Sequence, residues 1–419
     1  MSAIFDYIDL GNYDNKAIPY SERKSIALLL GAGFSAPMGY PIGNDMNEYL
    51  LNFDDRNVDF SPSGVLASSI DGTKPNFQIG GVLNNHQKYF VFCKKLIKEY
   101  AQKHGNRFDY EEFFDFIKSD EPKDKDYQRL LLGLCEEREL YEEYLYNVPH
   151  IYNQMVAHLL KDKTGKTWYD DEPFKMNYFD GYSGFLRCLS KLSEKYIVNV
   201  HTLNHDLLFE SFNSTGFING NISDGFDEYG SEYFGKLTAN QRTYHCRLER
   251  FTGRYNTSIR LYKLHGSLDY VPFYKVDKYG RMIPDNYVKI RWGIGAGDIM
   301  KDSGSKAEYE HSPFEYHSDF LTGTTYKMKR YHEPLLYAKL FEEFKKNLRD
   351  AEKLIVIGYG CKDEGINEMI LECFDYKNKP SFFVDAFAED GSPVLKFKDK
   401  LNAKMHRVQI EDIDESLFE

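Results

Sequence analysis

The chain has 419 residues, of which 42% are hydrophobic and 28% charged, a balance typical of a soluble globular protein. Its formal net charge of -12 argues against a broad nucleic-acid-binding surface. No apolar run approaches the length of a membrane span, and the N-terminus lacks a basic start followed by an apolar stretch. We therefore expect a cytoplasmic protein that makes no direct contact with nucleic acid or membrane.

Five short segments are predicted to be buried parallel strands, because each is a nearly continuous apolar run of strand length. In chain order these segments are residues 25–30, 196–200, 260–264, 353–358 and 381–385. Helical patterning precedes the second strand at 181–196 and the fourth strand at 335–353. Because strands and helices alternate, the sequence predicts an α/β fold, a Rossmann-like open parallel sheet with helices on both faces.

A long helical stretch separates the first two predicted strands. Apolar residues recur there at three- and four-residue spacing, as in Phe113 and Ile117, among many Glu and Lys residues. We therefore predict a helical insertion or subdomain after the first strand, at residues 51–180. Residues 1–50 and 181–419 would then form the Rossmann-like domain.

The segment from Pro284 to Pro334 shows no clear periodicity, and we predict an ordered loop region over the edge of the sheet. It contains His311, His317 and His332, whose spacing matches no compact set of metal ligands. A metal site is therefore the weaker alternative, and no metal is predicted. The six cysteines are scattered and form no Cys-x-x-Cys pair, so neither a disulfide framework nor a zinc ribbon is indicated.

The first predicted strand runs into the motif Gly-x-Gly-x-x-Ala, formed by Gly31, Gly33 and Ala36. Missing side chains in such a turn let backbone amides and a helix N-terminus approach a pyrophosphate. A tight strand-to-helix turn without any ligand explains the same glycines equally well. The motif alone leaves both interpretations open.

Polar residues also follow the next two predicted strands. Asn204 and Asp206 come directly after the second strand, and His265 comes after the third. Taken singly, these residues are explained as a helix cap, a surface acid and a turn histidine. Because the carboxyl ends of parallel strands share one edge, where ligands bind, their coincidence favours a common binding crevice.

Four blocks resemble those of the sirtuin superfamily, in particular its bacterial sirtuin-like NADases of anti-phage defence systems. The blocks are GAGFSAPMGYP (31–41), TLNHD (202–206), KLHGS (263–267) and VIGYGCKDEGIN (356–367). The resemblance covers roughly the whole chain, with the helical stretch as a family-variable insertion. It implies that residues 1–50 and 181–419 form an NAD-binding catalytic domain.

The resemblance implies hydrolysis of NAD+ at the nicotinamide glycosidic bond, with NAD as the substrate and nicotinamide and ADP-ribose as the products. Asn204 would position the attacking water at the anomeric carbon. His265 would hydrogen-bond the ribose hydroxyls and act as general base or proton relay, which imidazole can do near neutral pH. Asp206 would orient the nicotinamide amide or fix the loop.

Further residues of the matching blocks would bind the dinucleotide. Those assigned by resemblance to the pyrophosphate and the nearby ribose are Gly31, Ala32, Gly33 and Ser35. Gly358, Tyr359 and Asp385 would bind the adenosine half. Gly360 stands where the family usually has a small hydroxyl residue, so phosphate contacts from that loop would come from backbone amides.

The chain also departs from the protein-deacylating sirtuins, because it lacks their two close pairs of zinc-binding cysteines. This difference argues against deacylation. An NAD-depleting effector needs control, and the resemblance names a HerA-type ATPase or an Argonaute-like protein as candidate partners. The 16% aromatic content is compatible with a homo-oligomer.

Two alternatives to an NADase remain open. One is a non-catalytic NAD- or ADP-ribose-sensing regulatory subunit, which would not need Asn204 and His265 together. The other is an ordinary dehydrogenase, with an acidic residue from the stretch 49–55 about twenty positions after the glycines. The dehydrogenase leaves the blocks that follow the second and third strands unexplained.

Overall fold

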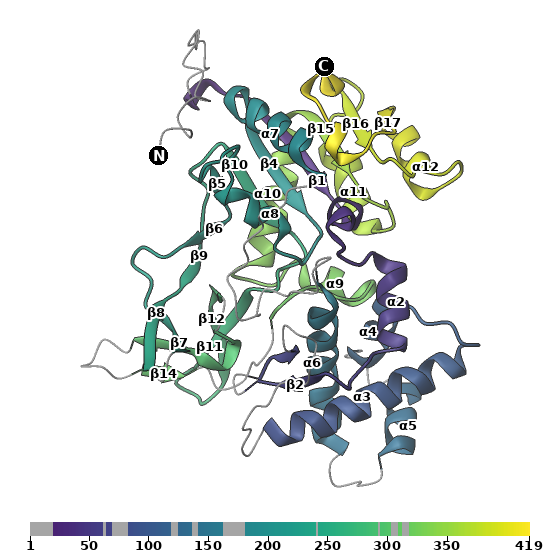
Figure 1. Ribbon diagram of the computed structural model, residues 1–419, viewed down its shortest axis with the longest axis vertical. Coiled ribbons are helices and arrows are strands. Elements are labelled where there is room, and N and C mark those ends of the chain that lie inside the picture. Colours follow the sequence, from purple (N-terminus) through teal and green to yellow (C-terminus); the bar gives the residue numbers. More distant parts are fainter. Residues whose placement is uncertain are drawn as a thin grey trace, which may run out of the picture.

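The computed structural model describes most of the chain. The described residues are 20–61, 64–68, 83–118, 125–135, 141–161, 181–239, 242–291, 294–302, 309–311 and 318–419. Figure 1 shows a central sheet flanked by helices, a group of helices between its first two chain-ordered strands, and a region of antiparallel strands beside them. Within the described part of the chain, no helix is both long and apolar enough to cross a lipid bilayer.

A seven-stranded parallel sheet forms the centre of the fold, in the order β17-β16-β15-β1-β4-β10-β5. Its strands are β1 (Ser25–Leu30), β4 (Ile197–Thr202), β5 (Ile222–Ser223), β10 (Ile259–Lys263), β15 (Ala351–Ile357), β16 (Ser381–Val384) and β17 (Lys404–His406). The predicted α/β fold and its five parallel strands are confirmed. The two edge strands β5 and β17 were missed, because segments of two and three residues give no apolar run.

Helices cover both faces of this sheet, as the alternation of strand and helix predicts. Outside the insertion the helices are α1 (Ala32–Ser35), α2 (Gly43–Leu51), α7 (Ser183–Lys195), α8 (Leu208–Ser211), α9 (Thr325–Arg330), α10 (Tyr337–Asp350), α11 (Glu364–Cys373) and α12 (Pro393–Lys400). Alternate residues of β1 enter different cores: Leu28 packs with α7, and Leu29 packs with α10 and α11. A strand buried on both faces reads as a continuous apolar run, which is why it was visible in the sequence.

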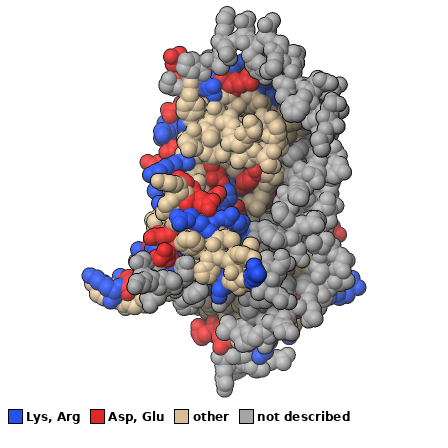
Figure 2. Space-filling model, turned by 60° about the vertical axis from the view of Figure 1, so that its left-hand side comes forward, with Lys and Arg blue, Asp and Glu red and all other residues tan. Residues whose placement is uncertain are grey.

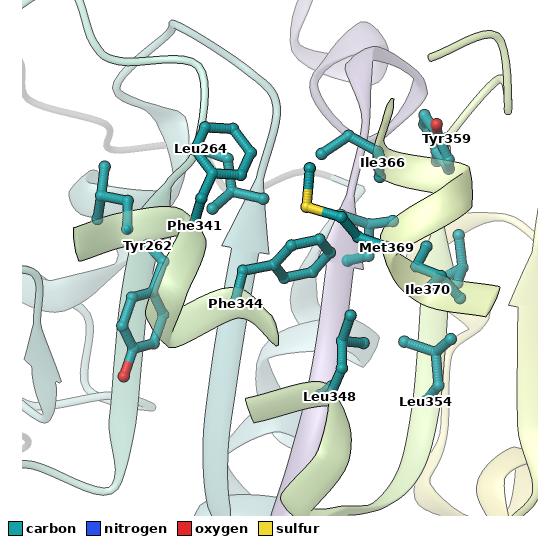
Figure 3. Packing of buried hydrophobic residues seen from close by; sticks show 14 of the residues in the cluster. Tyr262, Leu264, Phe341, Phe344, Leu348, Leu354, Tyr359, Ile366, Met369 and Ile370 are labelled. Atoms are coloured by element: carbon teal, nitrogen blue, oxygen red, sulfur yellow. The ribbon is translucent and has the colours of Figure 1, made fainter. Parts of the chain in front are cut away.

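The core under α10 and α11 shows how helical spacing builds the second layer. Figure 3 shows Phe344 and Leu348 of α10 on the same face of the sheet as Met369 and Ile370 of α11. Leu340 joins them, so three α10 residues at four-residue spacing are all buried on one face, as the helical patterning of 335–353 predicts. Full burial of such a side chain contributes about 1.5–3 kcal/mol.

The helical insertion has a hydrophobic core of its own. Its elements are β2 (Val58–Phe60), β3 (Leu66–Ser68), α3 (Leu83–Lys103), α4 (Tyr110–Lys118), α5 (Lys125–Leu134) and α6 (Tyr141–Leu159). Phe113 and Ile117 lie in this core, as their spacing predicted. Leu50 of α2 packs in the same cluster, and so do Leu268 and Phe320 from later in the chain.

Besides the antiparallel pair β2–β3 of the insertion, two four-stranded antiparallel sheets were not predicted. Their strands are β6 (Gly225–Asp227), β7 (Tyr233–Ala239), β8 (Arg242–Arg247), β9 (Glu249–Arg254), β11 (Tyr270–Val276), β12 (Met282–Lys289), β13 (Ile299–Asp302) and β14 (Tyr309–His311). The expected loop between Pro284 and Pro334 is therefore wrong, because this segment contains most of β12, all of β13 and β14, and α9. The sequence of β8, Arg-Thr-Tyr-His-Cys-Arg, is largely exposed and shows no apolar pattern.

One carboxylate fastens the insertion to helix α9. Asp115 of α4 accepts hydrogen bonds from the Thr324 hydroxyl at 2.6 Å, from Thr325 N at 2.7 Å and from Tyr326 N at 3.1 Å. The first amides of a helix have no partner within the helix, so a carboxylate from elsewhere can cap them. Asp115 thus fixes the start of α9, which carries Lys327 toward the site described below.

Replacing Asp115 with alanine tests this cap. We expect a loss of about 1–2 kcal/mol in the free energy of unfolding, the usual value of a helix cap, and faster amide exchange at Thr325 and Tyr326. Calorimetry and hydrogen exchange measure the two effects. Asp126→Ala is the control, since this exposed carboxylate of α5 pairs only with Arg129 among the described residues. Equal effects of the two substitutions would contradict the capping role.

Candidate functional site

The residues singled out from the sequence lie after five adjacent strands of the parallel sheet. Following the strand order from β16 to β10, these residues are Asp385, Gly358, Gly31, Asn204 and His265. All five strands are parallel, so their carboxyl ends form one edge. The chain leaves β1 for β4 on one side and returns through β15 on the other, which is the kind of switch point where ligands bind in open α/β sheets.

The glycine turn after β1 packs directly against the turn after β15. Gly31 N donates a hydrogen bond to Ile357 O at 3.1 Å, and Gly33 N donates to Gly358 O at 2.9 Å. A Cβ atom on Gly31 would lie 2.6 Å from Tyr359 Cα, and one on Gly33 would lie 2.9 Å from Gly358 Cα. Close approach of two backbones therefore explains both glycines without a ligand.

Only part of this turn is open to a dinucleotide. The amides of Gly31 and Gly33 are used in the contact with the neighbouring turn. Ala32 is exposed at the start of α1, whereas the side chain of Ser35 is buried. The predicted pyrophosphate contacts of these four residues stay a prediction, with Ala32 as the most accessible of them.

Asn204 is locked to the glycine turn by its side-chain amide. Its Nδ2 atom donates to Gly31 O at 3.0 Å and to Ser35 Oγ at 2.9 Å, and its backbone N donates to Thr202 Oγ1 at 3.1 Å. Both amide hydrogens are thereby used. The carbonyl oxygen Oδ1 is the group of Asn204 left to accept a hydrogen bond from water or substrate.

Ser35 connects Asn204 to Asp206. The Ser35 hydroxyl accepts from Asn204 and acts to lower the pKa of the nearby Asp206, whose carboxylate accepts from Leu208 N at 3.0 Å. Burial raises the pKa of Asp206, and the charge of Lys263 and these hydrogen bonds partly offset that rise. Of the two roles predicted for Asp206, fixing the loop after β4 has direct hydrogen-bond support.

Lys263 is a part of the site that the sequence analysis did not identify. This last residue of β10 is fully buried, at 0% exposure, and its Nζ lies 2.8 Å from Glu210 Oε1. The same ammonium donates to the backbone oxygens of Asp206 and His205. A lysine at the end of an apolar strand is the signal that was available, since buried lysines are almost always paired.

His265 lies in a buried row of charged groups. Its Nε2 atom is 3.4 Å from Asp363 Oδ2, and that carboxylate lies 2.9 Å from Lys327 Nζ. Lys327 in turn is 3.2 Å from Glu111 of the insertion. Burial would raise the pKa of Asp363, but its interactions with His265 and Lys327 hold that pKa well below its usual range.

A second histidine lies beside this row and stays neutral. The ring of His205 is 6.3 Å from that of His265 and 4.8 Å from Phe320. Burial lowers the pKa of His205 well below its ordinary value, and the positive charge of Lys263 acts in the same direction. His205 therefore adds an uncharged, half-buried wall to the site.

Tyr359 and Asp385, predicted on the adenosine side, differ in what they offer a ligand. Tyr359 is 5% exposed and borders the core under α11 (Figure 3). Its hydroxyl lies 3.1 Å from Asp363 O of its own loop and 3.0 Å from Asn367 Oδ1 of α11. Asp385 is half-buried and accepts from Phe387 N at 2.9 Å. A ligand contact from Tyr359 would therefore come from its backbone.

No metal cluster stands out in the described part of the chain. No group of three or more His, Cys, Asp or Glu side chains that could hold a metal ion occurs among the residues the structure describes. The side chains of His311 and His317 lie outside those residues. On the coloured part of the face shown in Figure 2, basic and acidic side chains are mixed within one band.

Comparisons with known proteins give a distant structural likeness. No protein-family model and no curated protein matches the chain. A solved Sir2 enzyme aligns over 94% of this chain and 89% of its own length, at 10% identity and a TM-score of 0.32. A Sir2 homolog in complex with NAD aligns over 95% and 89%, at 10% identity and a TM-score of 0.34. Likeness at this level assigns neither activity nor ligand.

The contact between the two turns predicts a severe effect of Gly358→Ala. Gly358 has a φ of 62°, and an added Cβ would lie 2.3 Å from Phe34 N. The left-handed backbone alone costs roughly 1–2 kcal/mol for a residue with a side chain, and the clash adds to it. Thermal unfolding should show a large drop in Tm, whereas Gly360→Ala, whose Cβ meets open space, should change it little. Similar curves for both variants would refute the close-packing explanation.

The Lys263–Glu210 pair predicts strong coupling in a double-mutant cycle. Lys263→Met should destabilise the protein by about 3–5 kcal/mol, because it leaves Glu210 buried without its cation. Lys263→Met combined with Glu210→Gln should cost clearly less than Lys263→Met alone. Denaturant unfolding measures Lys263→Met, Glu210→Gln and the double variant. Additive losses would mean that the two side chains do not stabilise each other.

Proposed function

We propose that the protein is an NAD+ glycohydrolase that cleaves the nicotinamide glycosidic bond and releases nicotinamide and ADP-ribose. The observation that carries the proposal is the pairing of Asn204, held by Gly31 and Ser35, with His265 after the adjacent strand. Asn204 then presents a fixed hydrogen-bond acceptor, and His265 offers a base. The four sequence blocks that resemble sirtuin-like NADases support the same activity.

The order of the strands supports a direction for the bound dinucleotide. Asp385 and Gly358 follow β16 and β15, so the adenosine half would lie there. Ala32, at the start of α1, would meet the pyrophosphate. Asn204 and His265 come next along the edge, where the nicotinamide ribose would lie. This sequence of contacts matches the order of groups in NAD.

The proposed reaction is a hydrolysis at the anomeric carbon. The C–N glycosidic bond breaks, and its electron pair passes to the nicotinamide ring, which leaves as a neutral molecule. A water held by Asn204 Oδ1 forms the new C–O bond, and its proton passes to His265 and then to solvent. Holding water and substrate in line supplies much of the acceleration, and the scheme requires neither a metal ion nor a covalent nucleophile.

The biological role that we propose is an NAD-depleting effector of bacterial anti-phage defence, acting in the cytoplasm as a homo-oligomer. Such an activity must be restrained until it is needed, because NAD loss harms the cell that makes the enzyme. A HerA-type ATPase or an Argonaute-like protein is the kind of partner that the sequence resemblance names for this control. A non-catalytic NAD- or ADP-ribose-sensing subunit is the alternative that the assay below separates.

The test is to incubate the purified protein with NAD and to measure nicotinamide and ADP-ribose by chromatography. His265→Ala should lower turnover by about 10²–10⁴-fold, the usual contribution of a general base. His104→Ala, at an exposed histidine of the insertion, is the matched control and should leave turnover unchanged. Near-wild-type turnover of His265→Ala would refute the mechanism. NAD binding by calorimetry without release of nicotinamide would favour the sensing subunit.

Asn204→Ala should also abolish turnover, but with a cost in stability. The substitution leaves Gly31 O and Ser35 Oγ without their common donor, which costs about 1–3 kcal/mol for a buried polar group. The His265 variant is therefore the cleaner probe of chemistry.

A further inference from the structure

Four charged or ionisable side chains from four separate elements meet beside the proposed active site. His265 follows β10, Asp363 follows β15, Lys327 lies on α9 and Glu111 lies on α4 of the insertion. The side chains of His265, Asp363 and Lys327 are each 7% exposed. Three successive N–O distances of 3.4, 2.9 and 3.2 Å join the row. No step of the hydrolysis proposed above uses Asp363, Lys327 or Glu111.

The carboxylate of Asp363 is fixed by its two oxygens in different ways. Oδ1 accepts a hydrogen bond from Ile366 N at 3.1 Å and so caps helix α11. Oδ2 is left to face Lys327 and His265. The carboxylate cannot rotate without breaking its capping hydrogen bond to Ile366 N, so Oδ2 presents a defined acceptor to the imidazole.

The imidazole needs this acceptor. Nε2 of His265 is buried and has no hydrogen-bond partner among the described residues, and Asp363 Oδ2 faces it at 3.4 Å. The neighbouring Phe320 and the ring of His205 supply no carboxylate. A buried ring N–H without an acceptor is costly, so the proton belongs on Nε2 beside Asp363. Nδ1 then keeps its lone pair and is the nitrogen able to accept a proton from water.

Lys327 and Glu111 hold the carboxylate from the side of the insertion. Lys327 lies between the two acids. Burial alone would lower the pKa of Lys327, but the charges of Glu111 and Asp363 outweigh that effect and raise it. The ammonium therefore stays charged. Glu111 lies on the same helix as Asp115, which caps the start of α9. Helix α4 therefore fixes both the start of α9 and the ammonium that α9 carries.

We propose that Asp363 is the positioning residue of His265, setting its ring orientation and tautomer, and that the insertion keeps Asp363 in place through Lys327 and Glu111. The effect on turnover rests on the NADase function proposed above. The effect on the tautomer does not, because it concerns the ligand-free protein. The 3.4 Å separation is longer than a well-formed hydrogen bond, and catalytic hydrogen bonds often tighten only when substrate is bound.

The first experiment reads the tautomer of His265 by ¹⁵N NMR of histidine-labelled protein without NAD. His265→Gln identifies the resonances by their loss. We expect a proton on Nε2 in the wild type and a mixture of tautomers in Asp363→Asn, whose side chain keeps the helix cap but loses the charge. Asp414→Asn is the matched control, because Asp414 caps a short helix far along the chain. A proton on Nδ1 in the wild type, or an unchanged spectrum in Asp363→Asn, would overturn the proposal.

The second experiment measures steady-state cleavage of NAD by the same variants. Asp363→Asn should lower kcat by about 10²-fold and change KM by less than about 3-fold, since the step it supports is proton transfer. Lys327→Met and Glu111→Gln should lower kcat in the same way, and Asp414→Asn should not. A loss confined to KM would assign Asp363 to binding and overturn the positioning role. A wild type that shows the expected tautomer but never cleaves NAD would instead refute the proposed function.

Discussion

The site depends on the contact between two backbones at the centre of the sheet. The turns after β1 and β15 approach so closely that Gly31, Gly33 and Gly358 leave no room for a Cβ atom. Two hydrogen bonds, from Gly31 N and Gly33 N to the end of β15 and the turn after it, fix the position of the turn after β1. That turn then supplies Gly31 O and Ser35 Oγ, the two acceptors that orient Asn204. Backbone packing, which needs no ligand, therefore determines where the side-chain amide of Asn204 lies.

Buried polar groups extend this order from β1 to β4 and β10. Each group at the edge is held by the next strand: Asn204 by the turn after β1, and the loop after β4 by Lys263 of β10. Such networks gain little net stability, because desolvation offsets most of their attraction, yet removing one member leaves a costly unpaired group. Their consequence here is a single conformation of the loops. The proposed hydrolysis, which holds a water and a base in line, would benefit from that rigidity.

Which features could be predicted from the sequence depended on how far apart along the chain the interacting residues are. Strands such as β1 were predicted because burial on both faces leaves a continuous apolar run, and the parallel arrangement then brought Asn204 and His265 to one edge. The strand β8 was missed because its ladder is made by backbone atoms and leaves no trace in its polar side chains. The pairing of Glu111 with Lys327 joins residues 216 positions apart, and no local pattern records such a contact. The ligand contact predicted for Tyr359 stays a prediction, and the bond of its hydroxyl to Asp363 O could not be read from the sequence.

The same long-range contacts bear on what the insertion is for. Leu268 and Phe320 flank the turn of His265 and are buried in the hydrophobic cluster of the insertion. Leu268 N donates to His205 O at 3.1 Å, and Leu321 N, from the residue after Phe320, donates to His265 O at 2.7 Å, so the backbone around this apolar pair is tied to both histidines. Undocking the helices would expose these side chains, at about 1.5–3 kcal/mol each, and would free the turn. The insertion is thus part of the wall of the site, and any signal that shifts it acts on His265 through packing as well as through charge.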